Sequence, residues 1–174
     1  MKYFTILALG LVVPSLLMAA PPPIPPFVQD YFDAAKLEYE LPHGRFDAFL
    51  ASVFEAENQA EPWALIADVN GDDIDDWAGL LRDSDGQLDL VCVYSVSGGY
   101  SHTILSELGL DSEGIGVGVE LVLAGDVEGF PFDNEVPDPT VSLDHPGVHL
   151  MYYEKSSVLY YWKDGSFQKF WTSD

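Results

Sequence analysis

Residues 68–76 carry five carboxylates in nine positions and lie between two short apolar runs. The runs, residues 64–67 and 77–81, have the length and composition of β-strands. At an effective dielectric constant near 20, two carboxylates about 5 Å apart repel by roughly 3 kcal/mol. The sequence therefore predicts an acidic loop between two neighbouring strands, and it favours a bound cation that offsets the repulsion.

The oxygen atoms of this loop have the spacing of a calcium site. Side-chain oxygens occupy the first, third, fifth and ninth positions, and the backbone carbonyl of the seventh residue supplies another. Calcium takes six to eight oxygens at about 2.3–2.6 Å, and flexible cages of this kind suit it better than magnesium. The predicted ligands of Ca²⁺ are Asp68, Asn70, Asp72, Ile74 and Asp76. The alternative, a solvated acidic turn without an ion, stays open.

From Asp68 to Asp76 the chain resembles the calcium loops of FG-GAP and VCBS-type repeats in secreted proteins, which read roughly Asp-x-Asn-Gly-Asp-Gly-x-x-Asp between two strands. The resemblance implies that the side-chain ligands are the three aspartates at positions one, five and nine and the asparagine at position three. Asp73 departs from the pattern, because the family usually has glycine there in a left-handed turn, a conformation that aspartate tolerates better than most residues. A propeller needs at least four blades of about 40 residues. The resemblance therefore extends to the loop and its flanks and not to a propeller.

The first twenty residues have the pattern of a secretory signal peptide. Lys2 precedes an apolar run, residues 4–18, that ends in two alanines. This run is short for a bilayer, which needs about 20 apolar residues. The protein is therefore expected to be periplasmic or secreted, without stable membrane insertion after cleavage. Residues 21–26 form a proline-rich leader, and residues 27–174 are expected to form a single domain.

Two helical patterns precede a series of short strands. Apolar and aromatic residues recur at helical spacing in residues 27–35 and 46–54, and Pro42 and Gly44 separate the two. Further on, extended runs are predicted at residues 64–67, 77–81, 88–95, 100–105, 117–124, 148–153, 157–162 and 167–171. Residues 125–147 are rich in turn formers and are expected to be a long connection. This order predicts an α+β domain, in which an N-terminal helical pair packs on an antiparallel sheet of about six to eight strands.

The net charge of the chain restricts the classes of molecule that it is expected to bind. The chain has 29 acidic residues against 7 Lys and Arg, and its formal net charge is −22. Nucleic acids and anionic membranes require basic surfaces, so neither is expected as a partner. An acidic surface attracts cationic proteins and collects cations. The expected partner is therefore a cationic protein or a glycan, with adaptation to a salty habitat as the alternative explanation of the charge.

No known catalytic constellation is present in the sequence. Cys92 is the single cysteine and lies in an apolar strand pattern, so we expect a buried side chain and no disulfide within the chain. The sequence lacks a Gly-x-Ser-x-Gly elbow and a glycine-rich phosphate loop. With 29 acidic residues, no particular pair stands out as the two carboxylates of a glycosidase. A binding role is therefore favoured over an enzymatic one.

Aromatic residues gather near the C-terminus on strands whose side chains alternate between two faces. Tyr and Trp dominate the hot spots of protein interfaces. The candidate partner-binding residues are Tyr152, Tyr160, Trp162 and Trp171. Core packing is the alternative role for the same residues.

Two functions from different classes follow from these observations. The first is an exported β-rich domain with a structural calcium loop and a non-enzymatic binding role. The second is a periplasmic inhibitor or immunity-type protein that binds a cationic wall-degrading enzyme through charge complementarity. A hydrolase is a third alternative, without a residue constellation to support it.

Overall fold

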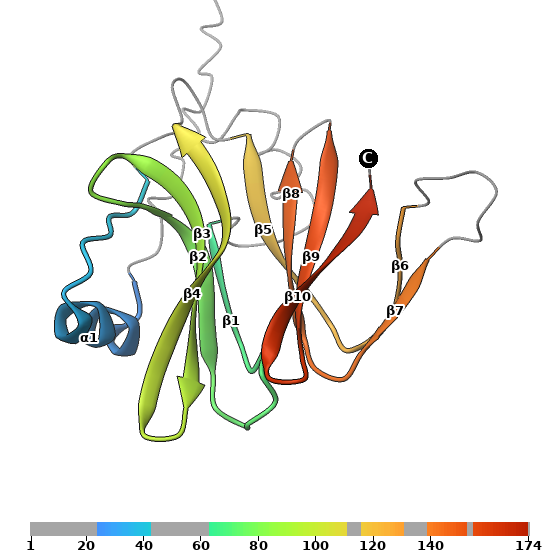
Figure 1. Ribbon diagram of the computed structural model, residues 1–174, viewed down its shortest axis with the longest axis horizontal. Coiled ribbons are helices and arrows are strands. Elements are labelled where there is room, and N and C mark those ends of the chain that lie inside the picture. Colours follow the sequence, from blue (N-terminus) through green and yellow to red (C-terminus); the bar gives the residue numbers. More distant parts are fainter. Residues whose placement is uncertain (1–23, 43–62, 111–115, 131–138, 153–154, 174) are drawn as a thin grey trace, which may run out of the picture.

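The computed structural model describes residues 24–42, 63–110, 116–130, 139–152 and 155–173. One helix and ten strands lie in these ranges (Figure 1). In chain order they are α1 (Pro26–Ala35), β1 (Ala64–Ala67), β2 (Asp76–Arg82), β3 (Gln87–Val96), β4 (Gly99–Leu110), β5 (Val117–Val122), β6 (Gly125–Glu128), β7 (Thr140–Leu143), β8 (Gly147–Tyr152), β9 (Ser156–Lys163) and β10 (Ser166–Ser173). No helix among these residues is long and apolar enough to cross a bilayer.

The strands form two four-stranded sheets and one two-stranded sheet, and all their pairings are antiparallel. The first sheet has the order β1-β2-β3-β4, and the second has the order β10-β9-β8-β5. Strands β6 and β7 pair with each other beside the second sheet (Figure 1). Most neighbouring strands are also neighbours in the sequence, so short turns build most of both sheets.

The two larger sheets face each other and share one hydrophobic core. The first sheet contributes Leu80, Leu90 and Cys92, and the second contributes Leu150 and Val158, all fully buried. The architecture is therefore a β-sandwich, in which side chains of alternate residues on each strand interdigitate between the sheets. Cys92 is buried as the sequence predicted, and burial raises the pKa of its thiol far above the ordinary value.

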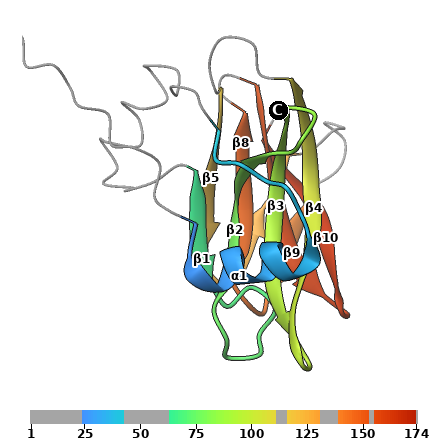
Figure 2. The ribbon, with the colours of Figure 1, turned by 90° about the vertical axis from the view of Figure 1, so that its left-hand side faces the viewer.

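Helix α1 covers the outer face of the first sheet, on the side away from the second (Figures 1 and 2). Its first turn contains Pro26, whose fixed φ suits a helix start, and Lys36 caps its C-terminal end in a left-handed conformation with φ 56°. Val28 and Phe32 are buried against Trp77 and other apolar residues of β2 and β3. Strand β3 is consequently covered on both faces, which explains its unbroken apolar run.

The predicted fold class, an N-terminal helical pair packed on one antiparallel sheet, is wrong. The described chain is mostly strand, with one short helix and three sheets. An alternating strand pattern shows that one face is buried, and it does not tell whether a helix or a second sheet covers that face. The second helical pattern, residues 46–54, lies outside the described residues, as does the signal peptide pattern.

The predicted strand positions agree with the structure to within two residues, with two larger differences. Strand β4 continues to Leu110, five residues beyond the predicted end. Residues 125–147, expected to be a structureless connection, contain β6 and β7. The β1–β2 loop lies at the same end of the sandwich as the β3–β4 and β9–β10 turns (Figure 1).

Candidate functional site

The 68–76 loop, which runs from the end of β1 to the first residue of β2, is wound around the carboxylate of Asp68. One oxygen of Asp68 accepts hydrogen bonds from the backbone N–H groups of Gly71 (2.7 Å) and Asp72 (3.1 Å). The other oxygen accepts a bond from the N–H of Asp73 (2.9 Å). Gly71 and Asp73 have φ 80° and 66°. Asp73 thus adopts the left-handed conformation that glycine has in the resembling loops.

Ser95, a buried residue of β3, ties this loop to the neighbouring strand. Its carbonyl accepts a hydrogen bond from the Asn70 amide nitrogen (2.9 Å), and its hydroxyl donates to a carboxylate oxygen of Asp72. Sequence reasoning missed Ser95, because it lies about twenty residues beyond the loop. The β2–β3 register, which pairs Trp77 with Val93, brings Ser95 to the end of the loop.

Asp76 lies beneath the loop and is fully buried. Its carboxylate accepts three backbone hydrogen bonds, from Val69 (3.0 Å), Asn70 (3.3 Å) and Ser95 (2.8 Å). Burial raises the pKa of Asp76 above its ordinary value, the three N–H donors oppose this shift, and the charge of Asp72 adds to it. Asp76 therefore joins the start of the loop, at Val69 and Asn70, to β3.

The predicted metal ligands occupy different depths of the loop. Ile74 and Asp72 are exposed, Asp68 and Asn70 are half-buried, and Asp76 is buried. Within the described part of the chain, no three Asp, Glu, His or Cys side chains form a metal-binding group. The carboxylates point instead at the N–H groups that shape the loop.

The donor chemistry of the loop fits a hard cation. A carboxylate has about four lone-pair sites, so an oxygen that accepts an N–H can also bind a cation. Within the described residues, Asp68, Asp72 and Asp76 accept seven hydrogen bonds from backbone N–H groups, including that of Ile74 to Asp72 (3.0 Å), and one from the Ser95 hydroxyl. These donors are neutral, so they orient the carboxylates without removing their mutual repulsion. Calcium would supply the missing positive charge.

The His145 ring lies directly against Gly71, where an added Cβ would overlap it. We expect Gly71→Ala to lower the free energy of unfolding by about 2 kcal/mol, because left-handed strain of about 1 kcal/mol adds to displacement of the ring. Gly86→Ala is the matched control: its φ is 77° and nothing lies within 4 Å of an added Cβ. Urea denaturation of both variants measures the difference.

The double variant Gly71→Ala/His145→Ala tests the origin of that difference. Once the effect of His145→Ala alone is subtracted, the double variant should lose only as much free energy of unfolding as Gly86→Ala, because the imidazole ring is gone. If Gly71→Ala and Gly86→Ala lowered the free energy of unfolding equally, His145 of the β7–β8 connection would not be packed on the loop.

The four candidate partner-binding aromatics lie toward the interior of the sandwich. Tyr160 is in the core, and Tyr152 and Trp171 pack against it, partly buried. Trp162 contacts the rings of Tyr94 and Phe167, with centroids 5.2 and 5.0 Å away. The structure gives these residues packing contacts, and a partner-binding role for them stays a prediction.

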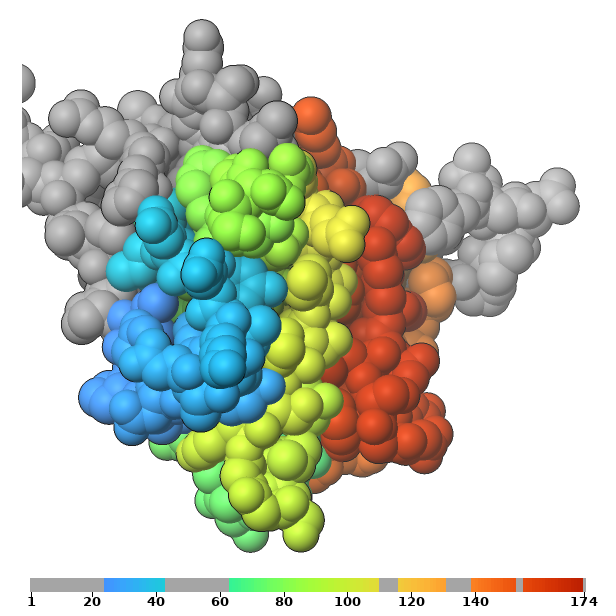
Figure 3. Space-filling model, turned by 60° about the vertical axis from the view of Figure 1, so that its left-hand side comes forward, coloured from blue at the N-terminus to red at the C-terminus, as the bar shows by residue number. Residues whose placement is uncertain are grey.

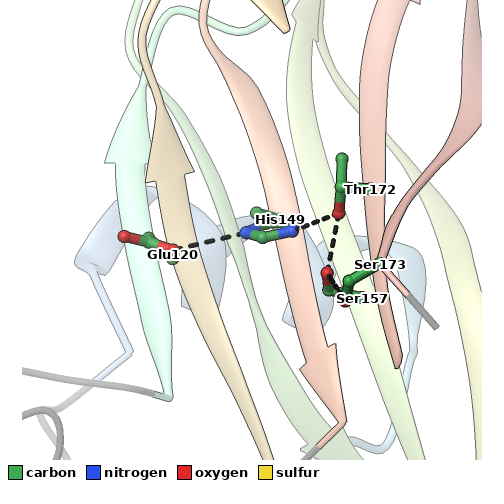
Figure 4. A network of polar contacts seen from close by, with 5 residues as sticks. All are labelled: Glu120, His149, Ser157, Thr172 and Ser173. Carbon is green, nitrogen blue, oxygen red and sulfur yellow. Dashed lines mark hydrogen bonds and ion pairs between the residues drawn. The ribbon is translucent and has the colours of Figure 1, made fainter. Parts of the chain in front are cut away.

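A polar network that sequence reasoning missed crosses the second sheet (Figure 4). His149 Nδ1 lies 3.3 Å from Glu120 Oε2, and His149 Nε2 lies 2.8 Å from the Thr172 hydroxyl. The Thr172 hydroxyl bonds to Ser157, which also bonds to Ser173. Thr172 sits at a register shift between β9 and β10 that turns neighbouring hydroxyls to one side.

The order carboxylate, imidazole, hydroxyl in this network is that of a hydrolase triad. Catalysis also requires donors for an oxyanion and room for an acyl group. In this network the hydroxyls bond one another, and the contacts link β5, β8, β9 and β10.

Asp89 and Glu107 face each other across the β3–β4 ladder on the outer face of the first sheet. Asp89 is 4% exposed. Burial, followed by the charges of Asp83 and Glu107, raises the pKa of Asp89 above 3.8. Directly opposed like charges in a sheet destabilise it.

Asp89→Asn is expected to stabilise the protein at neutral pH by roughly 0.5–1 kcal/mol, the scale of a like-charge cross-strand pair. A carboxyl whose pKa is raised by folding gives stability at low pH, and the stability is lost as pH rises through the raised pKa. Wild type should therefore lose stability relative to Asp89→Asn between about pH 4 and neutrality. Melting temperatures across this range measure it, with the exposed Asp85→Asn as control. If the difference in melting temperature between wild type and Asp89→Asn did not change with pH, the raised pKa of Asp89 would be contradicted.

Comparison of the chain with protein-family models, curated proteins and solved structures finds no match to any of them.

Proposed function

We propose that the protein is an exported, non-enzymatic binding domain whose 68–76 loop holds a structural calcium ion. One observation carries this proposal: a loop of five carboxylates is fixed to the core by Asp76 and to strand β3 by Ser95. Without a cation, these neutral hydrogen bonds would have to hold like charges together. The local resemblance to FG-GAP and VCBS-type loops supports the same ion, and the N-terminal pattern supports export.

Asp68, Asn70 and Asp72 would bind the ion with their side chains and Ile74 with its carbonyl. Asp76 would be the fifth ligand, on the buried side of the loop. The ion would neutralise part of the charge and pin β1 against β2, whose register pairs Ala67 with Asp76. Extracellular calcium modules bind with a Kd of about 10⁻⁴–10⁻³ M, and we expect the same range here.

Calorimetric titration of the mature protein with calcium tests the proposal. We expect one site in wild type and at least a tenfold weaker affinity in Asp68→Asn/Asp72→Asn. The matched control is Asp83→Asn/Asp85→Asn, which removes the same charge from another acidic turn and should bind as wild type does. If both double variants lost calcium affinity equally, net charge alone would explain the loss. If wild type did not bind calcium, the calcium site would be refuted.

A second candidate function is inhibition of a cationic wall-degrading enzyme, favoured by the net charge of −22. Such a complex should form fast at low ionic strength and more slowly as salt rises. Surface plasmon resonance with a purified cationic muramidase, together with its lytic activity, tests this function. Binding that is absent at 20 mM salt, or binding without loss of lysis, would contradict inhibition.

A further inference from the structure

Strand β4 forms one edge of the first sheet among the described strands. It has 12 residues, more than any other described strand, and among the described strands it pairs only with β3. In an antiparallel ladder, alternate residues direct their N–H and C=O groups to the unpaired side. Figure 3 shows β4 exposed along the surface between α1 and the second sheet.

The other sheet edges are shorter or partly covered. Strand β1 has four residues and contacts β5 of the second sheet. On β10, the Trp171 carbonyl accepts a hydrogen bond from the Phe130 N–H (3.0 Å). Strand β4 contains no Lys, Arg or Pro, the residues that commonly block edge pairing. Register shifts disturb its second half, so its regular part is its first six residues.

Contacts with α1 hold this regular part in place. The Tyr31 hydroxyl and His102 Nδ1 share a hydrogen bond of 2.8 Å, and the rings of Phe27 and Tyr100 stack with centroids 5.1 Å apart. A strand that is already ordered loses little conformational freedom on pairing. Ile104, at the end of the regular part, is 41% exposed and offers an apolar contact.

The charge around this edge selects a basic partner. Glu107 on β4 lies opposite the buried Asp89, and the charge of Asp83 also acts on Asp89. A residue paired beyond Glu107 would extend this acidic row, where Lys or Arg would be attracted and Asp or Glu repelled. The net charge of −22 on each chain opposes pairing of two copies.

We propose that β4 binds an extended basic segment of another protein as a fifth strand of the first sheet. An apolar side chain of that segment would lie beside Ile104 and a Lys or Arg beside Glu107. This inference rests on the binding role proposed above and locates it. It does not involve the calcium loop.

Fluorescence anisotropy with a labelled peptide of alternating valine and lysine, about ten residues long, tests the proposal. A second peptide carries N-methyl groups on alternate residues, which keep its charge and remove its donors along one edge. We expect the first peptide to bind at least tenfold more tightly, and hydrogen exchange to slow in the β4 amides. Ile104→Lys should weaken binding at least tenfold. The control Ile66→Lys makes the same change at an exposed isoleucine on the opposite edge strand, β1, and should bind as wild type does.

Pairing at β4 would be overturned if the two peptides bound equally, or if the two lysine variants weakened binding equally. Only a general attraction of basic ligands would then remain, and this is compatible with the proposed binding role. No binding of either peptide would also overturn pairing at β4, whereas the muramidase and calcium measurements decide the proposed functions independently. Sedimentation showing a wild-type dimer that Ile104→Lys abolishes would assign the edge to a second copy and overturn the basic partner.

Discussion

Replacing Asp76 with alanine is expected to lower the free energy of unfolding by about 3 kcal/mol or more. The substitution leaves the N–H groups of Val69, Asn70 and Ser95 without the carboxylate that accepts them. Each buried donor left unpaired costs about 1–3 kcal/mol. Removing a buried carboxyl group, whose pKa is raised by burial, offsets part of this loss. Chemical denaturation in EDTA measures the effect without bound calcium.

Two other variants separate the role of the Asp76 carboxylate from that of charge. Asp75→Ala removes an exposed carboxylate from the same loop and should change stability by less than about 0.5 kcal/mol. Asp76→Asn keeps one acceptor oxygen and should lie between wild type and Asp76→Ala. If Asp76→Ala were as stable as Asp75→Ala, the carboxylate would not hold the loop to β3.

Phe32→Ala is expected to destabilise the protein by about 3–5 kcal/mol, the usual range for removing a buried phenylalanine ring. Phe32 is 2% exposed, packs beneath α1 with Trp77 and Val91, and has its ring centroid 5.3 Å from that of Tyr39. Its loss should open the outer face of the first sheet. Thermal unfolding, followed by near-ultraviolet circular dichroism of the surrounding aromatic residues, measures this.

Asp30→Ala is the matched control on the same helix, because Asp30 is exposed. It should change stability by less than about 0.5 kcal/mol. A loss below about 1 kcal/mol in Phe32→Ala would mean that α1 is not docked on β2 and β3, and that their outer face has another cover.

Local features of this fold follow from the sequence. The helix at residues 26–35 and the strand positions were predictable because side-chain spacing records which face of an element is buried. The partner of that face was not predictable. Val148 and Leu150 of β8 alternate with less buried residues as they would beneath a helix, and the structure shows them packed against another sheet. The prediction of one sheet under two helices was wrong for this reason.

The candidate site divides in the same way. The position of the 68–76 loop was predictable from carboxylate spacing, and the left-handed backbone at Asp73 from the resemblance to FG-GAP and VCBS-type loops. The contacts of Ser95 and His145 were not, because each comes from a distant strand or connection whose position depends on sheet register. The burial of Asp76 was also not predictable from the sequence, because an aspartate at the end of an acidic run is normally exposed. The network around His149 joins four strands and has no local pattern.

Thermal unfolding of the mature protein in calcium and in EDTA tests the central claim most directly. With a Kd of about 10⁻⁴–10⁻³ M, 10 mM calcium should stabilise the folded state by roughly 1.4–2.7 kcal/mol. Wild type and Asp83→Asn/Asp85→Asn should therefore melt several degrees higher in calcium than in EDTA, whereas Asp68→Asn/Asp72→Asn should melt at the same temperature in both. Identical melting of wild type with calcium and with EDTA would contradict the account.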